Sequence, residues 1–559
     1  DFCVQRPEDV IFTNTFSPFT NLSYYKGGGS RDGEERFKSY FAINANKRLG
    51  FGFYIDYLYG RGLYQDQSTA FFNGGLFSSY RGDKYDMHFI FNNDNLKMAE
   101  NGGITDDRYI TNPLDMAEGK KEYSANEIPT RLSQIWNHNT SYHAFLTHRY
   151  NLGFYKEKQD SVDTDSVKIT QVFVPVTSFI HTLQVDLNNR KYISYDDAQN
   201  QKYFEHNYLG TDSIDKTKRT SIKNTIGIAL QEGFNKWAKA GLTAFLSYEY
   251  RNFALTDTTN IPGQRIINNY KESSLSIGGE LSKKQGKLLH YNILGELAIA
   301  GEDAGQFSVE GRGDLNLRLF GDTVRLDVNA FIKNQNPVFY FRHFQSKHYW
   351  WDNNDLSKIM RTRLEGKLSL NRWGTQLRAG VENIKNYTYL ANASIPVKDS
   401  EGNVTGFKNN AAVRQHSGNI QIFTAMLQQK LKVGIFHLDG EVAYQKSSEQ
   451  DILPLPELSA YGNLYMKFGL AKKVLQIEMG ADVRYFSKYY APDYSPVIGQ
   501  FYNQNPDDKI EIGAFPIVNV YANLHLKRTR FFIMMYHVNA GSGKSNYFLA
   551  PHYPINPRM

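Results

Sequence analysis

The chain has little cysteine, no long apolar runs and no strong charge of either sign. Its 559 residues include one cysteine, Cys3, which excludes an internal disulfide framework and any cysteine-based metal site. The longest clearly apolar run, Phe531 to Tyr536, is far shorter than the roughly 20 residues that a membrane-spanning helix needs. The net charge is +7 and no long basic block concentrates it, so nothing supports nucleic-acid binding.

The chain begins at Asp1-Phe2 without a secretory signal peptide. An exported protein must have carried one, so we expect a mature or trimmed piece of a longer precursor. The small residues that precede a lipid-modified cysteine are absent before Cys3, which favours an ordinary thiol.

Strict alternation of polar and apolar residues is the strongest pattern in the chain. From Gln306 to Lys333 it runs through two segments on either side of a tight turn at Gly321-Asp322. One face of the first segment carries Gln306, Ser308, Glu310, Arg312, Asp314, Asn316 and Arg318, and the other carries Phe307, Val309, Leu315, Leu317 and Leu319. In the second segment Arg325, Asp327, Asn329 and Lys333 oppose Val324, Leu326, Val328, Ala330 and Ile332. Each segment therefore predicts a strand with one wet face and one apolar face.

The same alternation recurs in hairpin after hairpin. It predicts strands at 19–26, 36–47, 51–64, 69–80, 84–95, 142–156, 172–186, 219–231, 237–251, 272–283, 288–300, 305–319, 323–335, 358–371, 375–390, 412–430, 434–446, 457–470, 474–489, 514–526 and 529–539. Tight turns alternate with long polar loops along the chain. The predicted loops are 96–141, 187–218, 252–271, 336–357, 391–411, 490–513 and 540–559. Aromatic residues make up 14% of the chain, which suits the girdles of a membrane barrel.

These features predict an all-β fold: a transmembrane antiparallel up-and-down β-barrel of about 22 strands, with its N-terminus in the periplasm. Residues 1–559 are expected to form a single barrel domain, and 1–18 a periplasmic N-terminal segment. Because the predicted strands are odd in number, we expect the last strand to follow Met559 unless one segment has been split or merged.

Charged residues at inward positions of the predicted strands are the candidate site. They are Glu310, Arg312, Asp314, Arg318, Arg325, Asp327, Arg363, Glu365, Lys367, Arg378, Glu382, Glu478, Asp482 and Arg484. One interpretation is that they solvate the lumen and pair across neighbouring strands. The other is that they form a mixed-charge constriction that selects solutes by charge.

Catalysis and metal binding have no pattern in their favour. No Ser-His-Asp arrangement follows from the spacing, so we expect no enzyme activity. The histidines at 138, 143 and 148 lack a regular spacing with carboxylates, so we expect neither a metal nor a cofactor.

Several segments resemble the putative β-barrel porin family of Bacteroidetes outer membranes. They are Ser17-Pro-Phe-Thr-Asn-Leu-Ser-Tyr24, Arg61-Gly-Leu-Tyr64, Thr147-His-Arg-Tyr-Asn-Leu-Gly-Phe-Tyr155, Gly380-Val-Glu-Asn-Ile-Lys-Asn-Tyr387, Val483-Arg-Tyr-Phe-Ser-Lys-Tyr-Tyr-Ala-Pro492, Gln500-Phe-Tyr-Asn503 and Phe515-Pro-Ile-Val-Asn-Val-Tyr521. Their order and coverage carry the resemblance, which implies an outer-membrane barrel. The stretch at 381–384 is also similar to TonB-dependent receptors, but predicted strands begin by residue 19, with no plug domain before them in this sequence. The resemblance further implies O-glycans at Asp-Ser/Thr sites, with Ser161, Ser166, Ser213 and Thr258 as candidates in predicted connections.

Two functions remain open. The first is a monomeric porin in the outer membrane of a Gram-negative bacterium, a channel for passive or loop-gated diffusion of small solutes. The second is an occluded structural barrel that serves as a subunit or client of an outer-membrane protein complex. The expected partners are outer-membrane lipid and lipopolysaccharide, with other outer-membrane proteins or lipoproteins in the second case.

Overall fold

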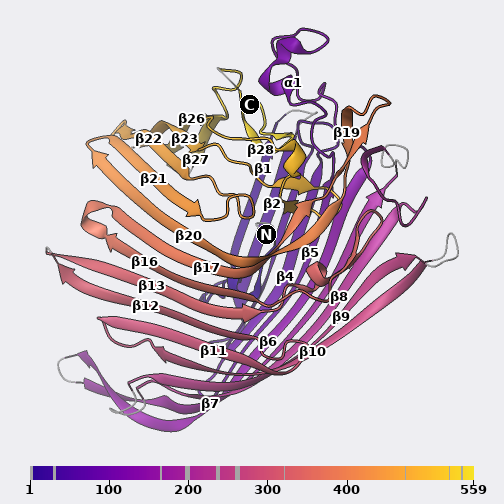
Figure 1. Ribbon diagram of the computed structural model, residues 1–559. Helices are drawn as coiled ribbons and strands as arrows, with labels where there is room; N and C mark the ends of the chain where they lie inside the picture. The colour runs from indigo at the N-terminus through magenta and orange to yellow at the C-terminus, as the bar shows by residue number, and fades with distance from the viewer. Residues whose placement is uncertain are drawn as a thin grey trace.

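A single antiparallel sheet of 21 strands makes up most of the protein (Figure 1). The structure, a computed structural model, describes residues 4–28, 33–163, 166–195, 202–233, 239–258, 265–319, 321–472, 474–527, 529–542 and 545–558, with only the backbone at 158–163, 166–170, 258, 319 and 322. In chain order the strands are β1 (Phe19–Gly27), β2 (Glu34–Asn44), β3 (Leu49–Gly60), β4 (Thr69–Arg81), β5 (Tyr85–Ala99), β6 (Ile135–Asp163), β7 (Ser166–Ser194), β8 (Ile214–Leu230), β9 (Gly241–Thr258), β10 (Arg265–Lys283), β11 (Leu289–Gly301), β12 (Phe307–Leu319), β13 (Asp322–Gln335), β16 (Ile359–Leu370), β17 (Thr375–Asn392), β20 (Ala411–Val433), β21 (Phe436–Ser447), β22 (Leu458–Leu470), β23 (Leu475–Phe486), β26 (Ile517–Leu526) and β27 (Thr529–Met535).

Each predicted strand corresponds to one strand of this sheet, but β6 and β7 are much longer than predicted, and β9 and β10 extend into the predicted loop at 252–271, through residues 252–258 and 265–271. The strands β6 and β7 are both 29 residues long and pair down to Asp163 and Ser166, so residues 157–163 and 166–171 belong to strands and not to a connection. The candidate glycosylation sites Ser161 and Ser166 therefore lie in strands, and Thr258 ends β9. The side chains of all three lie outside the described residues. Ser213 lies in the connection before β8, and its modification stays a prediction.

The two faces of the sheet differ in chemistry as the alternation predicts. Outward positions hold aliphatic and aromatic side chains that are left exposed, for example Ile226 at 55%, Leu364 at 54% and Val381 at 53%. One row of directly paired residues crosses six strands on this face: Leu315, Leu326, Leu368, Leu377, Leu427 and Val442. An exposed apolar band of this kind suits lipid rather than water.

Small elements occupy the connections. They are the helices α1 (Arg108–Thr111) and α3 (Phe339–Arg342), the 3₁₀ turns η1 (Pro7–Asp9), η2 (Pro113–Asp115), η3 (Asn371–Trp373) and η4 (Pro506–Asp508), and the short hairpins β14 (His343–Gln345) with β15 (Trp350–Asp352), β18 (Ile395–Lys398) with β19 (Val404–Lys408), β24 (Asp493–Ser495) with β25 (Gln500–Tyr502), and β28 (Phe548–Ala550) with β29 (Tyr553–Pro554). The helices and these hairpins gather at one end of the sheet, where the long connections lie (Figure 1). No helix among the described residues combines the length and apolarity needed to cross a membrane.

The described part of the N-terminal segment lies against the polar, concave face of the sheet. The Asn92 side chain on β5 donates a hydrogen bond to the carbonyl of Gln5 at 2.7 Å, and the Tyr40 hydroxyl on β2 donates to the carbonyl of Ile11 at 2.7 Å. Val10 is buried with inward side chains of β2 to β5. Residues 5–15 therefore pack inside the curve of the sheet. The periplasmic position of the N-terminal segment stays a prediction.

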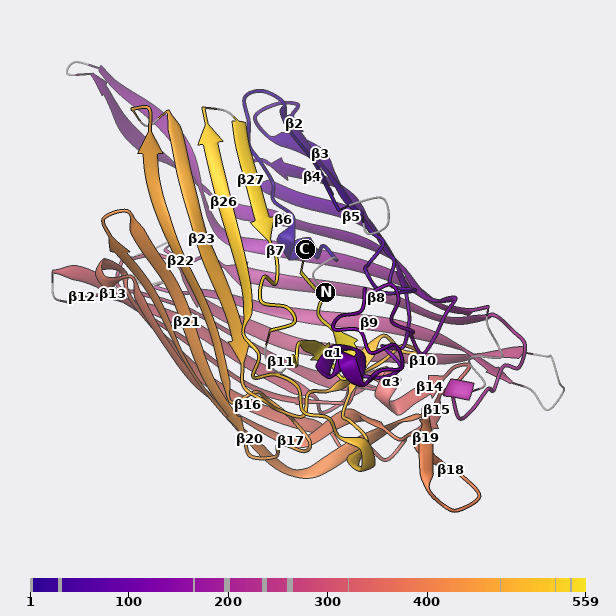
Figure 2. The ribbon, with the colours of Figure 1, turned by 90° about the horizontal axis from the view of Figure 1, so that it is seen from above.

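The sheet has two edges, β1 and β27. Among the described residues, β1 pairs only with β2 and β27 only with β26. Every pairing from β1 to β27 is antiparallel, and the sheet has 21 strands, so both edge strands run in the same direction. Figure 2 shows the sheet curving round until these edges come to the same side of the molecule, with both chain termini inside the curve.

Candidate functional site

The predicted pore-lining residues all lie on the concave face of the sheet. The pairing register shows this directly, since Asp314 faces Asp327, which faces Lys367, which faces Arg378. Glu310, Arg312 and Arg318 share the face of Asp314, Arg325 that of Asp327, Arg363 and Glu365 that of Lys367, and Glu382 that of Arg378. Glu478, Asp482 and Arg484 on β23 point the same way, opposite Lys467, Asn463 and Tyr461. Whether they line an open pore stays a prediction.

Most of these charges are paired across neighbouring strands. Arg325 Nη2 on β13 lies 3.6 Å from Asp314 Oδ1 on β12, and Lys367 Nζ on β16 lies 3.2 Å from Asp327 Oδ2 on β13. Further cross-strand pairs are Arg378 with Glu365 at 2.7 Å, Lys333 with Glu310 at 2.6 Å, Arg361 with Glu382 at 2.6 Å, and Lys467 with Glu478 at 3.3 Å. Two pairs lie within one strand, Arg325 with Asp327 on β13 and Arg363 with Glu365 on β16. Arg312 forms no ion pair with a described residue. The wall is therefore a network of ion pairs, with excess positive charge near Arg312.

Long connections fold together at one end of the sheet and form what we call the cap, the described residues of 100–134, 202–213, 336–358, 393–410, 448–457, 487–516 and 536–558. Backbone hydrogen bonds join pairs of them: Ile104 to His552, Glu205 to Asn409, and Tyr208 to Lys347. Because partners far apart in the sequence satisfy one another's backbone groups, these connections form one folded body rather than separate loops.

The cap has its own apolar core beside the sheet. One cluster unites Leu132, Phe204, Phe344, Tyr349, Trp351, Val497 and Tyr502 with the strand residues Ile135, Tyr192, Leu390 and Ala411. Tyr349 is fully buried, and its hydroxyl contacts Asn409 and lies 3.0 Å from Ser495 Oγ. A second cluster joins Tyr64, Ile104, Ile128, Ile512, Phe515 and Phe548.

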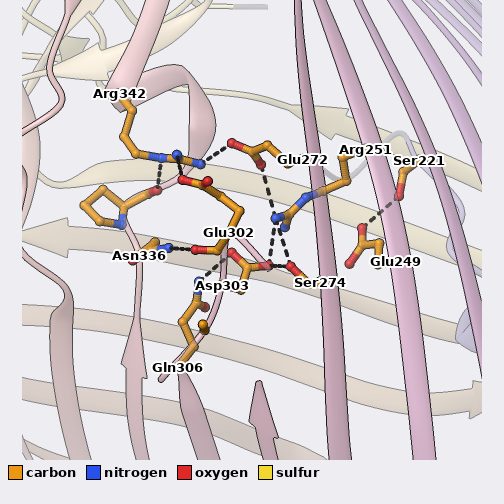
Figure 3. A network of polar contacts seen from close by, with 12 residues as sticks. Ser221, Glu249, Arg251, Glu272, Ser274, Glu302, Asp303, Gln306, Asn336 and Arg342 are labelled. Carbon is orange, nitrogen blue, oxygen red and sulfur yellow. Dashed lines mark hydrogen bonds and ion pairs between the residues drawn. The ribbon is translucent and has the colours of Figure 1, made fainter. Parts of the chain in front are cut away.

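A chain of ion pairs fastens the cap segment 336–358 to the wall (Figure 3). Arg342 of α3 lies 2.7 Å from Glu272 on β10 and 2.9 Å from Glu302. Arg251 on β9 lies 3.1 Å from Glu272 and 2.7 Å from Asp303. The side chains of Arg342 and Glu272 are only 13% and 7% exposed, so water screens their attraction less than it screens the pairs of the open wall.

A cavity of about 910 Å³ lies between the cap and the upper strands, and we call it the Arg190 cavity. Its lining combines aromatic rings and amide side chains, among them Tyr340, Phe344, Trp351, Tyr387, Tyr389, Tyr502, Asn137, Asn139, Asn188, Gln500 and Asn503. Arg190 is the one charged residue among the described residues of the lining. Pockets of about 300 to 1,000 Å³ with an apolar lining and a few polar groups are the usual form of a small-molecule site.

A β-bulge turns two of these rings inward. The register between β17 and β20 shifts between Lys385 and Tyr387, and Asn386 has a positive φ of 58°. The shift places Tyr387 and Tyr389 on the face of Glu382, whereas unbroken alternation would place them towards lipid. Sequence reasoning missed them. The one available signal is the asparagine, a residue that tolerates the left-handed conformation.

One carboxyl group bonded to the lining of the Arg190 cavity, that of Glu100, is mostly neutral at pH 7. Glu100, just past β5, accepts hydrogen bonds from Asn137 Nδ2 at 2.6 Å and from the Tyr494 hydroxyl at 3.0 Å. Burial, which outweighs these bonds, raises the pKa of Glu100 to about 8. Burial likewise lowers the pKa of His348 in the cap to about 3, so its imidazole is neutral at physiological pH.

The histidines noted in the sequence are engaged with single partners. His138 lies 2.8 Å from Asn95 Oδ1, His143 2.7 Å from Asp186 Oδ1, and His148 2.9 Å from His181. Among the described residues, no group of three or more His, Cys, Asp or Glu side chains is arranged to hold a metal ion.

Solved structures with the same sheet arrangement include several receptors. The siderophore receptor PirA from Acinetobacter baumannii is 9% identical, with a TM-score of 0.62 over 98% of this chain and 80% of that one. The ferric enterobactin receptor PfeA from Pseudomonas aeruginosa is 10% identical, with a TM-score of 0.59 over 96% and 78%. The copper transporter OprC is 10% identical, with a TM-score of 0.59 over 97% and 81%. At such identities the likeness shows the fold alone.

No curated protein matches the chain in sequence. A family model described as "Putative porin" matches residues 1–559. Because that match covers the whole chain, the protein belongs to the putative porin family.

Proposed function

We propose that this protein is an outer-membrane barrel of a Gram-negative bacterium through which small solutes diffuse when the cap opens. Porin-family membership supports a transport protein of the outer membrane. The apolar convex face and the charged concave face support a wall between lipid and water. The fold shared with siderophore receptors and a copper transporter is consistent with passage of solutes through the sheet interior.

The proposal includes closure of the sheet into a barrel of about 22 strands. The edge strands β1 and β27 run in the same direction, so they cannot form an antiparallel pair with each other. One further strand of the opposite direction would pair antiparallel with both and would leave no edge open to lipid. Unpaired backbone groups at such an edge would each cost several kcal/mol within a bilayer, roughly the price of an unmade hydrogen bond in hydrocarbon.

The observation that carries loop gating is the way the cap is attached. The segment 336–358 is tied to the wall through Arg342, and the segment 487–516 is tied through an isolated parallel bridge between Ala391 and Asn503. These connections span the interior without being strands of the sheet. They can therefore move while the barrel wall stays intact, which is the mechanical requirement for a gate.

The structural-subunit alternative has an observation in its favour as well. Lys347 and Tyr349 of the cap are fully buried, at 0% exposure, so part of the cap is packed like a protein core. Such a cap could remain shut, and the barrel would then serve as a scaffold for partner proteins of the outer membrane.

A reversible lock on the cap separates the two functions. In a Cys3→Ser background, the pair Ala391→Cys and Asn503→Cys joins β17 to the segment 487–516 at an existing bridge. We expect the oxidised protein to lose the conductance of the wild type in planar bilayers, and dithiothreitol to restore it. Thr424→Cys with Gln445→Cys joins the wall strands β20 and β21 and is the matched control, which should conduct in both states.

The outcomes differ cleanly. If the oxidised pair conducts like the reduced one, this segment is not the gate. If the wild type and both reduced variants are silent, the protein is not a channel and the structural role is the better account.

A further inference from the structure

We propose that the Arg190 cavity binds a small carboxylate carried on a six-membered ring. The proposal rests on the proposed function in one respect: a solute that crosses the barrel meets this cavity beneath the cap. Binding itself does not require that the cap open in a bilayer assay.

Arg190 supplies the anion-binding group. Its Nη2 atom donates hydrogen bonds to Asn137 Oδ1 at 2.7 Å and to the carbonyl oxygen of Val497, which holds the guanidinium in place. The other terminal nitrogen, Nη1, is buried and has no hydrogen-bond partner among the described residues. A buried, unpaired guanidinium N–H is costly, and a carboxylate is the acceptor that satisfies it best.

No described side chain of the lining carries a negative charge that would satisfy Arg190. Glu100 lies close enough to act on Arg190, but burial raises its pKa to about 8, so it is mostly neutral at pH 7. Asp215 also acts on Arg190 electrostatically, but it accepts a hydrogen bond from the backbone N–H of Lys347 and is not part of the lining. Neither carboxyl group forms a hydrogen bond with Arg190, so its Nη1 atom remains unpaired among the described residues.

The opposite lining provides flat apolar surfaces. The rings of Tyr387 and Tyr389 are nearly parallel, with centroids 6.0 Å apart and planes 8° apart. Phe344 and Trp351 stack on each other at 4.9 Å and contribute further aromatic surface. A planar or chair-shaped ring can lie against such faces, whereas a flexible chain would lose more conformational entropy on binding.

One further unpaired group lies on the strand side of the cavity. Thr217 Oγ1 is buried without a hydrogen-bond partner among the described residues, and Thr217 pairs with Arg190 on the same face of the sheet. Its hydroxyl can bond a hydroxyl group on the ring, which a sugar acid carries and a simple aromatic acid lacks. The shared chemistry is a ring-bound carboxylate, and the sources to be distinguished are a sugar acid and an aromatic acid.

Calorimetry or ligand-observed NMR on the full chain in detergent tests the proposal with glucuronate, benzoate and neutral glucose. We expect glucuronate to bind at least tenfold more tightly than glucose, because only the acid satisfies Arg190 Nη1. Arg190→Met should remove that difference. Thr217→Val should weaken glucuronate while leaving benzoate unchanged if the natural ligand is a sugar acid.

Since Arg190 also holds Asn137 and Val497, its variant could disturb the cap. Tyr387→Leu is the second test, because it removes one ring face without touching Arg190, and it should weaken both acids several-fold. Equal affinity for glucose and glucuronate, or no binding of either acid by the folded wild type, would overturn the proposal. Tight binding by a protein that is silent in bilayers would support the site while refuting the channel, so the two failures are distinguishable.

Discussion

Arginine introduced at two positions of β13 should have opposite consequences, because the positions face opposite sides of the sheet. Leu326 lies in the outward row between Leu315 and Leu368, whereas Asn329, three residues on, lies on the concave face between Arg312 and Glu365 of the two adjacent strands. Leu326→Arg therefore brings a charge to lipid, and Asn329→Arg brings the same charge to a hydrated wall.

The size of the effect follows from the position of Leu326 along its strand. It is the fifth residue of β13, which begins at Asp322. At about 3.4 Å per residue and a tilt of about 45°, Leu326 lies roughly 10 Å above the turn, within an apolar band about 25 Å tall. An arginine near the middle of that band costs about 2 to 4 kcal/mol. Asn329→Arg should change stability by less than about 1 kcal/mol, as exposed charge pairs do.

Reversible unfolding in lipid vesicles, followed by tryptophan fluorescence, measures both values, and heat-modifiable gel mobility reports whether each variant folds. Equal losses for the two variants would show that the assignment of faces is wrong. A large loss for Asn329→Arg alone would show that the faces are reversed.

Three further predictions concern the cap, the wall and the topology. The folded protein keeps the Glu100 proton up to about pH 8, whereas the unfolded chain releases it near the usual pKa of 4.5. The free energy of unfolding should therefore fall as the pH rises between these values, by up to about 1.4 kcal/mol per pH unit. Glu100→Gln should flatten this slope in denaturant titrations, and an unchanged slope would contradict the assignment. Replacing Arg312, Arg325 and Arg363 together by glutamine should shift the reversal potential of an open channel towards cation selectivity, and an unchanged potential would remove them from selection. In intact cells that express a Cys3→Ser variant, a bulky impermeant maleimide should label an added Lys121→Cys in the cap but not an added Asp83→Cys in a short turn. The reverse pattern would invert the proposed orientation.

The strands and their two faces could be predicted from the sequence for a simple physical reason. A wall between lipid and water meets two uniform environments, so side chains alternate with the period of the strand itself. This local rule identified each strand of the sheet and placed residues such as Asp327 and Glu365 on the concave face. It required no knowledge of which distant segments meet.

The Arg190 cavity could not be predicted in the same way. Arg190, Asn137 and Asn139 were assigned to loops because both faces of their segments are polar, yet β6 and β7 continue through them beyond the apolar band. The alternation of polar and apolar side chains ends where the strands leave the lipid. The backbone pairing of the strands continues beyond that point. Tyr387 and Tyr389 were hidden by the bulge beside Asn386, which reverses the two faces in one step.

The cap was decided by tertiary structure alone. Tyr349, Asn409 and Tyr502 come from three separate connections, and they meet because the curved sheet brings the ends of its strands together. Their sequence surroundings are those of ordinary polar loops, since the groups that their side chains bond lie at least 60 residues away. The sequence by itself therefore determined the wall of this protein, which obeys a local rule, whereas contacts between distant segments decided what closes the wall and what can bind beneath the cap.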